Sequence, residues 1–326
     1  MLDQSNVVNT VLGPVLTKDL GVVLIHESLL SVVPGAEYAP EIRIDKSEIF
    51  EILKQKLLDF RRVGGGTIVD RTGMFHGRDI KLYENLSKAT GVHIVASTGL
   101  GPQPMLSGYF TTPQKNPPIP WPAEKFAGLF IKEVTEGIVV PRVERSSAAG
   151  LVTSIASHEG IAELEINLFK GSGQTAMVTG VPVSVQFGSD AVAELEIILE
   201  EGIKAERIII GGLDRISAVN ENQALGVVQK GAYVAIDHIG WSSEEGFIND
   251  TDRAELIAEL IQRGYSKQIL LSTNAVGVAK GHMANDVKYD YLLTSFVPKL
   301  RNTGITDNQI KQLLEDNPQR VLTMDK

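Results

Sequence analysis

The chain has 326 residues, of which 43% are hydrophobic and 22% are charged, with no cysteine and a formal net charge of −9. This length suits one large α/β barrel and is short for two catalytic domains. The acidic balance argues against a nucleic-acid or anionic-membrane partner, and the lack of cysteine excludes disulfides and thiolate metal ligands. No apolar run approaches the roughly 20 residues that span a bilayer. The first residues lack an export-signal pattern, so we expect a cytoplasmic protein.

Short β-branched runs alternate with longer amphipathic stretches along the whole chain. The stretches 46–61 and 252–262, for example, carry apolar residues at three- and four-residue steps, which predicts helices. The predicted strands are 22–25, 67–69, 93–97, 151–155, 183–187, 207–210, 233–236 and 268–271.

This alternation predicts an α/β fold, a (β/α)8 TIM barrel that forms a single domain over residues 1–326. A doubly wound open sheet is the weaker alternative, because no Gly-x-Gly-x-x-Gly phosphate loop follows any strand. Gly171 and Gly173 interrupt a helical pattern and predict a weak or broken helix. The proline-rich stretch 113–122 is expected to be a loop over the barrel mouth. Left-handed helix ends are predicted at Gly91, Gly180, Gly202, Gly231 and Gly264.

The first predicted strand runs into His26-Glu27-Ser28, which resembles the His-x-His metal motif of the phosphotriesterase-like amidohydrolases with its second histidine replaced. Two imidazoles at i and i+2 point to the same side of a strand and can share a metal. The likeness extends from about Val8 to Val321. The segment 289–298 is especially similar to the family's bacterial homology proteins. Residues 9–14 resemble the family's opening strand, and residues 317–320 resemble its closing helix. Such a resemblance implies a (β/α)8 barrel with its reactive face at the strand C-termini.

The resemblance also implies a binuclear metal site, and most of its ligand positions are substituted here. His26 is retained, whereas Ser28 stands in place of the second histidine of the first strand. The bridging carboxylate of the fourth strand corresponds to Thr153 or Ser154. The remaining ligand positions correspond to Gln186 on the fifth strand, Gly212 on the sixth and Asn274 on the eighth.

Zinc lowers the pKa of its bound water from about 15.7 to about 7, and a catalytic zinc site needs about three protein ligands. One imidazole with hydroxyls and amides offers no anionic ligand for a pair of divalent cations. We therefore expect no metal and no other cofactor, and the loss of the family's metal-hydroxide mechanism.

Charged and aromatic residues nonetheless follow the predicted strands, and Asp214 corresponds to a family carboxylate that assists proton transfer. Without metals, His238 can still do acid–base work and Arg71 can hold a carboxylate or phosphate. We therefore predict His238, Asp214 and Arg71 as catalytic residues. The predicted binding pocket comprises His26, Ser28, His76, Ser154, Gln186, Gly212, Arg215, Asp237, Trp241 and Asn274.

Each of these residues also has a purely structural interpretation. His26 is more simply a leftover imidazole bonded to a backbone carbonyl, and Asp237 a residue that ties loops together. Arg71 and Arg215 equally well neutralise Asp214 and Asp237. A Ser-His-Asp triad using Ser28 is weakly indicated, because no Gly-x-Ser-x-Gly motif is present.

Three functions stay open at this point. The first is a repurposed enzyme that acts on a small ester-, lactone- or carboxylate-like molecule without metal. The second is a non-catalytic binding protein or partner subunit, and the third is a metal-dependent hydrolase whose ligands lie elsewhere. The expected partner is a small-molecule ligand, with no nucleic acid and no membrane, and the family likeness implies a homodimer.

Overall fold

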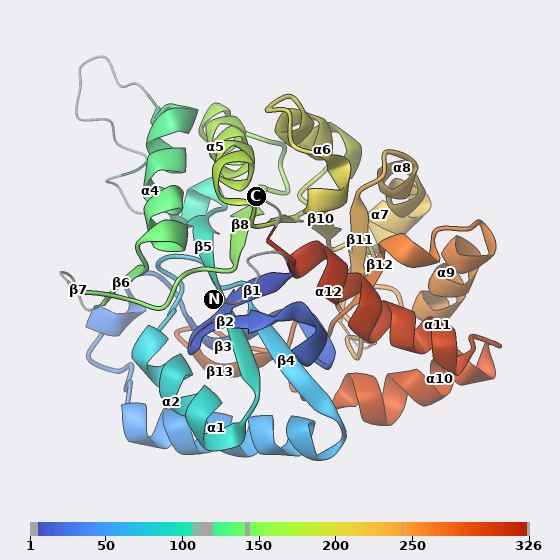
Figure 1. Cartoon of the computed structure of the whole chain (residues 1–326), viewed down its shortest axis with the longest axis horizontal. Coiled ribbons are helices and arrows are strands. Elements are labelled where there is room, and N and C mark those ends of the chain that lie inside the picture. Colours follow the sequence, from blue (N-terminus) through green and yellow to red (C-terminus); the bar gives the residue numbers. More distant parts are fainter. Residues whose placement is uncertain (1–5, 107–109, 111–119, 141–143, 243, 325–326) are drawn as a thin grey trace.

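The computed structural model describes residues 6–106, 110, 120–140, 144–242 and 244–324. Its central feature is a sheet of parallel strands (Figure 1), in the order β12-β11-β10-β9-β8-β5-β4-β3-β13. The last strand of the sequence, β13, pairs with the first strand of the sheet, β3. The strands are β3 (Val22–Val32), β4 (Gly65–Asp70), β5 (His93–Leu100), β8 (Leu151–Ile155), β9 (Val183–Gln186), β10 (Ile208–Gly211), β11 (Tyr233–Ile236), β12 (Ile269–Leu271) and β13 (Val276–Lys280).

Because β12 and β13 follow one another in the chain, they are two halves of one interrupted eighth strand. Their pairing with β11 on one side and β3 on the other closes the sheet. The predicted (β/α)8 barrel is therefore confirmed, and the open doubly wound sheet is wrong. Each of the eight predicted strands is present, although β3 is several residues longer than predicted.

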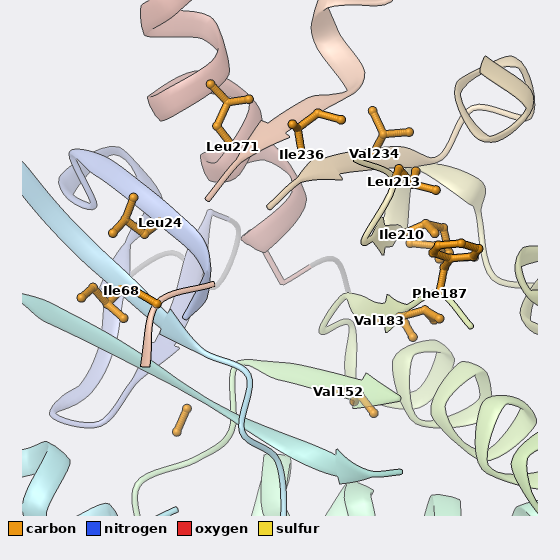
Figure 2. Packing of buried hydrophobic residues seen from close by; sticks show 14 of the residues in the cluster. Leu24, Ile68, Val152, Val183, Phe187, Ile210, Leu213, Val234, Ile236 and Leu271 are labelled. Atoms are coloured by element: carbon orange, nitrogen blue, oxygen red, sulfur yellow. The ribbon is translucent and has the colours of Figure 1, made fainter. Parts of the chain in front are cut away.

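Alternate residues of the strands face opposite sides of the barrel wall, as the two-residue period of a strand requires. Val23, Val69 and Ile209 belong to an apolar cluster inside the barrel. Their neighbours point outward and form the larger cluster beneath the helices (Figure 2). The labelled members of that outer cluster include Leu24, Ile68, Val152, Val183, Ile210, Val234 and Ile236.

Helices surround the barrel and begin at side-chain caps where the sequence supplies them. Asp45 and Asp79, for example, accept hydrogen bonds from the first turns of α1 and α2. The five glycines predicted to end helices all have positive φ, between 70° and 94°. The helices are α1 (Lys46–Arg62), α2 (Ile80–Thr90), α4 (Ala123–Thr135), α5 (Glu163–Thr179), α6 (Ala191–Leu199), α7 (Ile216–Asn220), α8 (Gln223–Gln229), α9 (Asp250–Gln262), α10 (Val297–Asn302), α11 (Asp307–Lys311) and α12 (Asn317–Leu322).

The prediction of a broken helix at Gly171 and Gly173 is wrong, because α5 is continuous. A Cβ atom on Gly171 would lie 2.8 Å from both Ala123 O and Phe126 Cβ of α4. Glycine therefore lets α4 and α5 pack closely, and this contact outweighs its low helix propensity. The predicted loop 113–122 lies mostly outside the described residues.

The N-terminal end of the barrel is closed by two terminal segments that lie side by side in Figure 1. The hairpin of β1 (Val7–Thr10) and β2 (Gly13–Leu16) stands where the sequence resemblance placed an opening strand. Val8 from this hairpin and Val321 from α12 are buried in the interior cluster. A separate antiparallel pair of short strands, β6 (Ile138–Val140) and β7 (Glu144–Ser146), is not part of the barrel sheet. Among the described residues, none of the helices has the length and apolarity required to cross a bilayer.

Candidate functional site

A bulge in β3 turns His26 toward the barrel interior. Leu24 pairs with Ile68 and Glu27 pairs with Asp70, so two residues of β3 lie opposite one residue of β4. Such an extra residue changes the direction in which the following side chain points. His26 consequently lies inside the wall, where it is completely buried.

Both ring nitrogens of His26 form hydrogen bonds with side chains. Nδ1 donates to Asp237 Oδ2 at 2.8 Å, and the Ser184 hydroxyl donates to Nε2 at 2.6 Å. Burial lowers the pKa of His26, which favours this neutral tautomer. The expected bond to a backbone carbonyl is replaced by these two side-chain partners. The structure also explains Gly211, because a Cβ there would lie 2.5 Å from Asp237 Oδ2 and 2.9 Å from His26 Nδ1.

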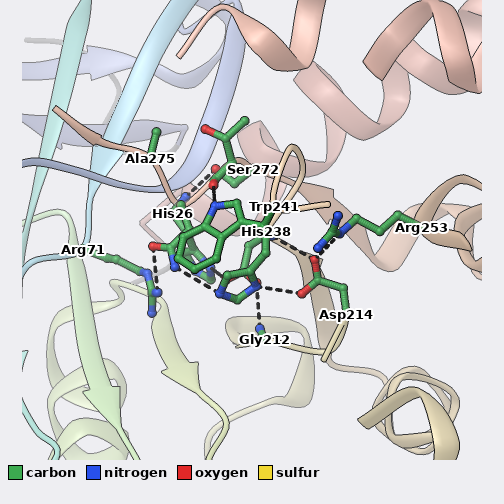
Figure 3. A network of polar contacts seen from close by, with 12 residues as sticks. His26, Arg71, Gly212, Asp214, His238, Trp241, Arg253, Ser272 and Ala275 are labelled. Atoms are coloured by element: carbon green, nitrogen blue, oxygen red, sulfur yellow. Dashed lines mark hydrogen bonds and ion pairs between the residues drawn. The ribbon is translucent and has the colours of Figure 1, made fainter. Parts of the chain in front are cut away.

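His238 lies against two carboxylates at the mouth of the barrel (Figure 3). Its Nδ1 donates to Asp214 Oδ1 at 2.8 Å and lies 3.1 Å from Asp237 Oδ1. Burial acts to lower the pKa of His238, but the two carboxylates outweigh burial and raise it. The ring packs against the aromatic rings of Trp241 and Phe247, at centroid distances of 4.8 and 4.3 Å. Trp241 is fixed in turn by a hydrogen bond from its Nε1 to Thr273 O.

Asp214 is neutralised by Arg253, a residue that the sequence analysis missed. Arg253 Nε donates to Asp214 Oδ2 at 2.7 Å, and its Nη1 donates to Asp250 Oδ1 at 2.8 Å. All three side chains are buried. The direct ion pair of Asp214 is thus with Arg253, whereas Arg215 interacts with this carboxylate only through charge attraction at longer range. A signal did exist, because Arg253 shares the buried face of α9 with Ile257 and Leu260.

Asn274 joins Arg71 to His238 across the mouth. Arg71 Nη2 donates to Asn274 Oδ1 at 3.1 Å. A guanidinium can only donate, so the amide oxygen faces Arg71 and the amide nitrogen faces His238. Asn274 Nδ2 lies 3.1 Å from His238 Nε2, which therefore accepts. Asn274 lies in the break between β12 and β13, with a left-handed φ of 46°.

The same break is bridged by Glu27, another residue without a predicted role. Its completely buried carboxylate accepts hydrogen bonds from Ser272 Oγ, Thr273 N, Thr273 Oγ1 and Ala275 N. Burial raises the pKa of Glu27 to about 7 against the opposing effect of these donors. The Glu27 side chain thus takes the place of the strand-to-strand hydrogen bonds that are missing where the eighth strand is interrupted.

Ser154 does not reach the mouth, and its assignment to the binding pocket is wrong. Its Oγ lies 2.7 Å from Ser172 Oγ on α5, outside the barrel wall. The preceding residue, Thr153, pairs in register with Ser184 and faces inward with it. Gln186 is buried, and its Oε1 has no partner among the described residues. The other pocket position, Gly212, has φ +82° and donates its backbone N–H to Asp237 Oδ1.

The remaining predicted residues lie around the rim. Ser28 is half-buried, with its backbone N–H bonded to Ala275 O and its carbonyl oxygen bonded to the Tyr289 hydroxyl. His76 Nε2 donates to Gly101 O at 3.2 Å. Arg215 Nη1 lies 2.9 Å from His158 Nε2, and its guanidinium lies 5.5 Å from the ring centre of Phe247.

Asp214, Asp237 and His238 each offer a ligand atom within 4.8 Å of the others, close enough to surround a cation. Their atoms are already paired, however. Asp214 accepts from Arg253 and His238, while Asp237 accepts from His26 and Gly212. A cation here would compete with the fixed positive charge of Arg253.

Comparisons with known proteins agree with this fold. The Phosphotriesterase family pattern matches residues 6–322. The N-acetyltaurine hydrolase of Salmo salar is 25% identical, with 98% of each chain covered. The phosphotriesterase homology protein of Mycobacterium tuberculosis is 27% identical, with 96% of each chain covered. A solved variant of the organophosphorus hydrolase from Deinococcus radiodurans is 24% identical over 97% of each chain, with a TM-score of 0.87. This chain therefore belongs to the phosphotriesterase family.

Proposed function

We propose that this chain acts on a small ester-, lactone- or carboxylate-like molecule at the barrel mouth, without a metal-held hydroxide. The observation that carries this proposal is the state of His26, the one imidazole retained at the family's ligand positions. Nδ1 carries the proton that it donates to Asp237, and the lone pair of Nε2 accepts from the Ser184 hydroxyl, so no lone pair of the ring is free for a metal. Metal binding would require the loss of a buried hydrogen bond, which costs about 1–3 kcal/mol for the group left unsatisfied.

Two other ligand positions support the same proposal. Ser154 is directed toward α5 rather than into the barrel. Asn274, which stands where the family has a metal-binding carboxylate, is neutral and is held by the Arg71 guanidinium. After burial, the positive charge of Arg71 is a further cause that lowers the pKa of His26. A fixed cation beside these positions opposes the binding of two more positive ions.

The residues at the mouth supply a metal-independent route for hydrolysis. His238 Nε2 takes a proton from a water molecule as its oxygen adds to the substrate carbonyl. Arg71 donates hydrogen bonds to the resulting oxyanion. When the carbon–oxygen bond to the leaving alcohol breaks, His238 returns the proton to that alcohol, so water and ester give acid and alcohol. Asp214 is a positioning residue, because it holds Nδ1–H and fixes the ring tautomer.

The experiment combines metal analysis with turnover. The purified protein is assayed with a lactone, an aryl ester, a phosphotriester and N-acetyltaurine, the compound named for a relative, with and without a chelator. We expect metal well below one equivalent, chelator-insensitive turnover, and at least a 100-fold loss in His238→Ala. His93→Ala is the matched control, because His93 begins β5 at the opposite end of the barrel. Two equivalents of metal with chelator-sensitive activity would overturn the proposal.

A second candidate function is binding without turnover. The observation that favours it is the hydrogen bond from Asn274 Nδ2 to His238 Nε2, which occupies the lone pair that a general base needs. Saturable binding of a small molecule with no turnover of any compound in the panel would support this function instead.

A further inference from the structure

Arg71 is a buried cation with unused hydrogen-bond donors. Its side chain is 8% exposed, and its backbone N–H donates to Glu27 O at the end of β4. Among the described residues, the guanidinium has one hydrogen-bond partner, Asn274 Oδ1, which accepts from Nη2. Nε and Nη1 are buried without a partner among the described residues. Buried arginines are almost always paired, so these donors call for an acceptor.

Arg215 is a second guanidinium with an unused donor at the same mouth. It follows the sixth strand, and its Nε is also buried without a partner in the described part of the chain. Its guanidinium lies 5.5 Å from the ring centre of Phe247, and that ring centre lies 4.3 Å from the ring centre of His238. Asn274 links His238 in turn to Arg71, so the two guanidinium groups border the same part of the mouth.

The carboxylates nearby attract both guanidinium groups, but their oxygens are hydrogen-bonded to other residues. Asp237 accepts from His26 and Gly212, and Asp214 accepts from Arg253 and His238. Within the described residues, no carboxylate lies at ion-pair distance from the guanidinium of Arg71 or Arg215. Both guanidinium groups thus keep donors for which the described residues supply no acceptor, and an anion is the ligand that matches such donors.

We propose that Arg71 and Arg215 together bind the carboxylate group of a small-molecule ligand at the barrel mouth. The donors of a guanidinium lie in one plane, and the two oxygens of a carboxylate match this planar geometry. The aromatic rings of Trp241 and Phe247 line the neighbouring wall and fit a short organic chain or ring. This inference rests on the proposed function only for the location of the site, and it narrows the ligand to a carboxylate-bearing molecule.

The test uses matched pairs of probes that differ in charge: benzoate with benzamide, and hexanoate with hexanamide. Binding to the full chain is measured by calorimetry at low and high salt. We expect the acids to bind and the amides to bind at least 10-fold more weakly. Arg71→Gln and Arg215→Gln should each weaken binding of the acids by roughly 10- to 100-fold. Arg263→Gln, an exposed arginine on the far side of α9, is the control that leaves binding unchanged.

Urea denaturation shows separately whether the variants remain folded. Because the Arg71 guanidinium is buried without an ion pair, Arg71→Gln should be at least as resistant to urea as the wild type. Arg71→Lys keeps the charge but not the planar donors and should recover part of the affinity. Equal binding of acids and amides, unchanged affinity in Arg71→Gln, or no saturable binding of either acid would overturn the proposal. Carboxylate binding without any ester turnover would leave it standing and overturn only the proposed hydrolysis.

Discussion

Ser184 Oγ lies 2.6 Å from Nε2 of His26, whose Nδ1 donates to Asp237. The three side chains thus reproduce the hydrogen-bond order of a Ser-His-Asp triad. Ser184 is nevertheless completely buried in β9, one inward-facing position below Gln186. The sequence weakly indicates a triad with Ser28, whereas the structure forms this arrangement with Ser184 inside the barrel wall. Its burial indicates a structural role.

This arrangement leads to the first prediction. Ser184→Ala leaves His26 Nε2 as a buried acceptor without a donor, so the free energy of unfolding should fall by about 1–2 kcal/mol. Urea denaturation measures this change. A fluorophosphonate probe should leave the wild-type protein unlabelled, because Oγ has no path to the reagent. Covalent labelling of Ser184 would contradict the structural role.

The ion pair of Arg253 with Asp214 and Asp250 gives the second prediction. Arg253→Met leaves two buried carboxylates without their cation and should reduce the free energy of unfolding by about 3–5 kcal/mol. The control is Arg263→Met, directly after the last residue of α9, where the pair of Arg263 with Glu259 is exposed and should be worth less than about 1 kcal/mol. Similar losses in the two variants by urea denaturation would show that the buried network is not the cause.

The packing of Gly211 gives the third prediction. In Gly211→Ala the new methyl group would meet Asp237 Oδ2 and His26 Nδ1, so the free energy of unfolding should fall by about 1–3 kcal/mol. Gly128→Ala is a matched control, because Gly128 is an exposed residue within α4 with no atom near its Cβ position. That control should gain about 0.5–1 kcal/mol in a thermal or urea unfolding experiment.

The fourth prediction concerns pH. The pKa of Glu27 rises from 4.5 to about 7 on folding, which corresponds to about 3 kcal/mol. A raised pKa in an acid means that the folded state holds the proton more tightly than the unfolded state. The contribution of Glu27 to stability is therefore complete below pH 4.5 and is lost as the pH rises toward 7.

The measurement is urea denaturation of the wild type and of Glu27→Gln at pH 5 and pH 8. Glutamine does not titrate, so the variant should lack the part of the pH dependence that comes from Glu27. An identical pH dependence in both proteins would show that the carboxylate has the same proton affinity in the folded and unfolded states.

The sequence predicted the fold well because the information is local. β-branched runs, amphipathic periods and glycines at helix ends each specify an element through its own residues, and the order of elements then specifies a barrel. The error at Gly171 arose from a contact between α4 and α5 that no local pattern contains.

The candidate site was less predictable, because it depends on register and on partners distant in the chain. The bulge at His26 exists only relative to β4, so the sequence could not show which way this imidazole turns. Ser154 was placed in the pocket although strand alternation directs Thr153 inward. Arg253 and Glu27 form hydrogen bonds with Asp214 and Ser272, which are distant from them in the sequence. In the sequence, their only indication of a role is that each is a charged residue among apolar ones.

At the interruption between β12 and β13, different residues hold the barrel together and face the ligand site. The Glu27 carboxylate bridges this break through hydrogen bonds from Ser272 and Ala275. The side chain at position 274 is therefore not needed to close the barrel. Its left-handed backbone favours Asn, Asp or Gly there. Substitutions at position 274 combined with substitutions of Arg71 should therefore change the ligand specificity without opening the barrel.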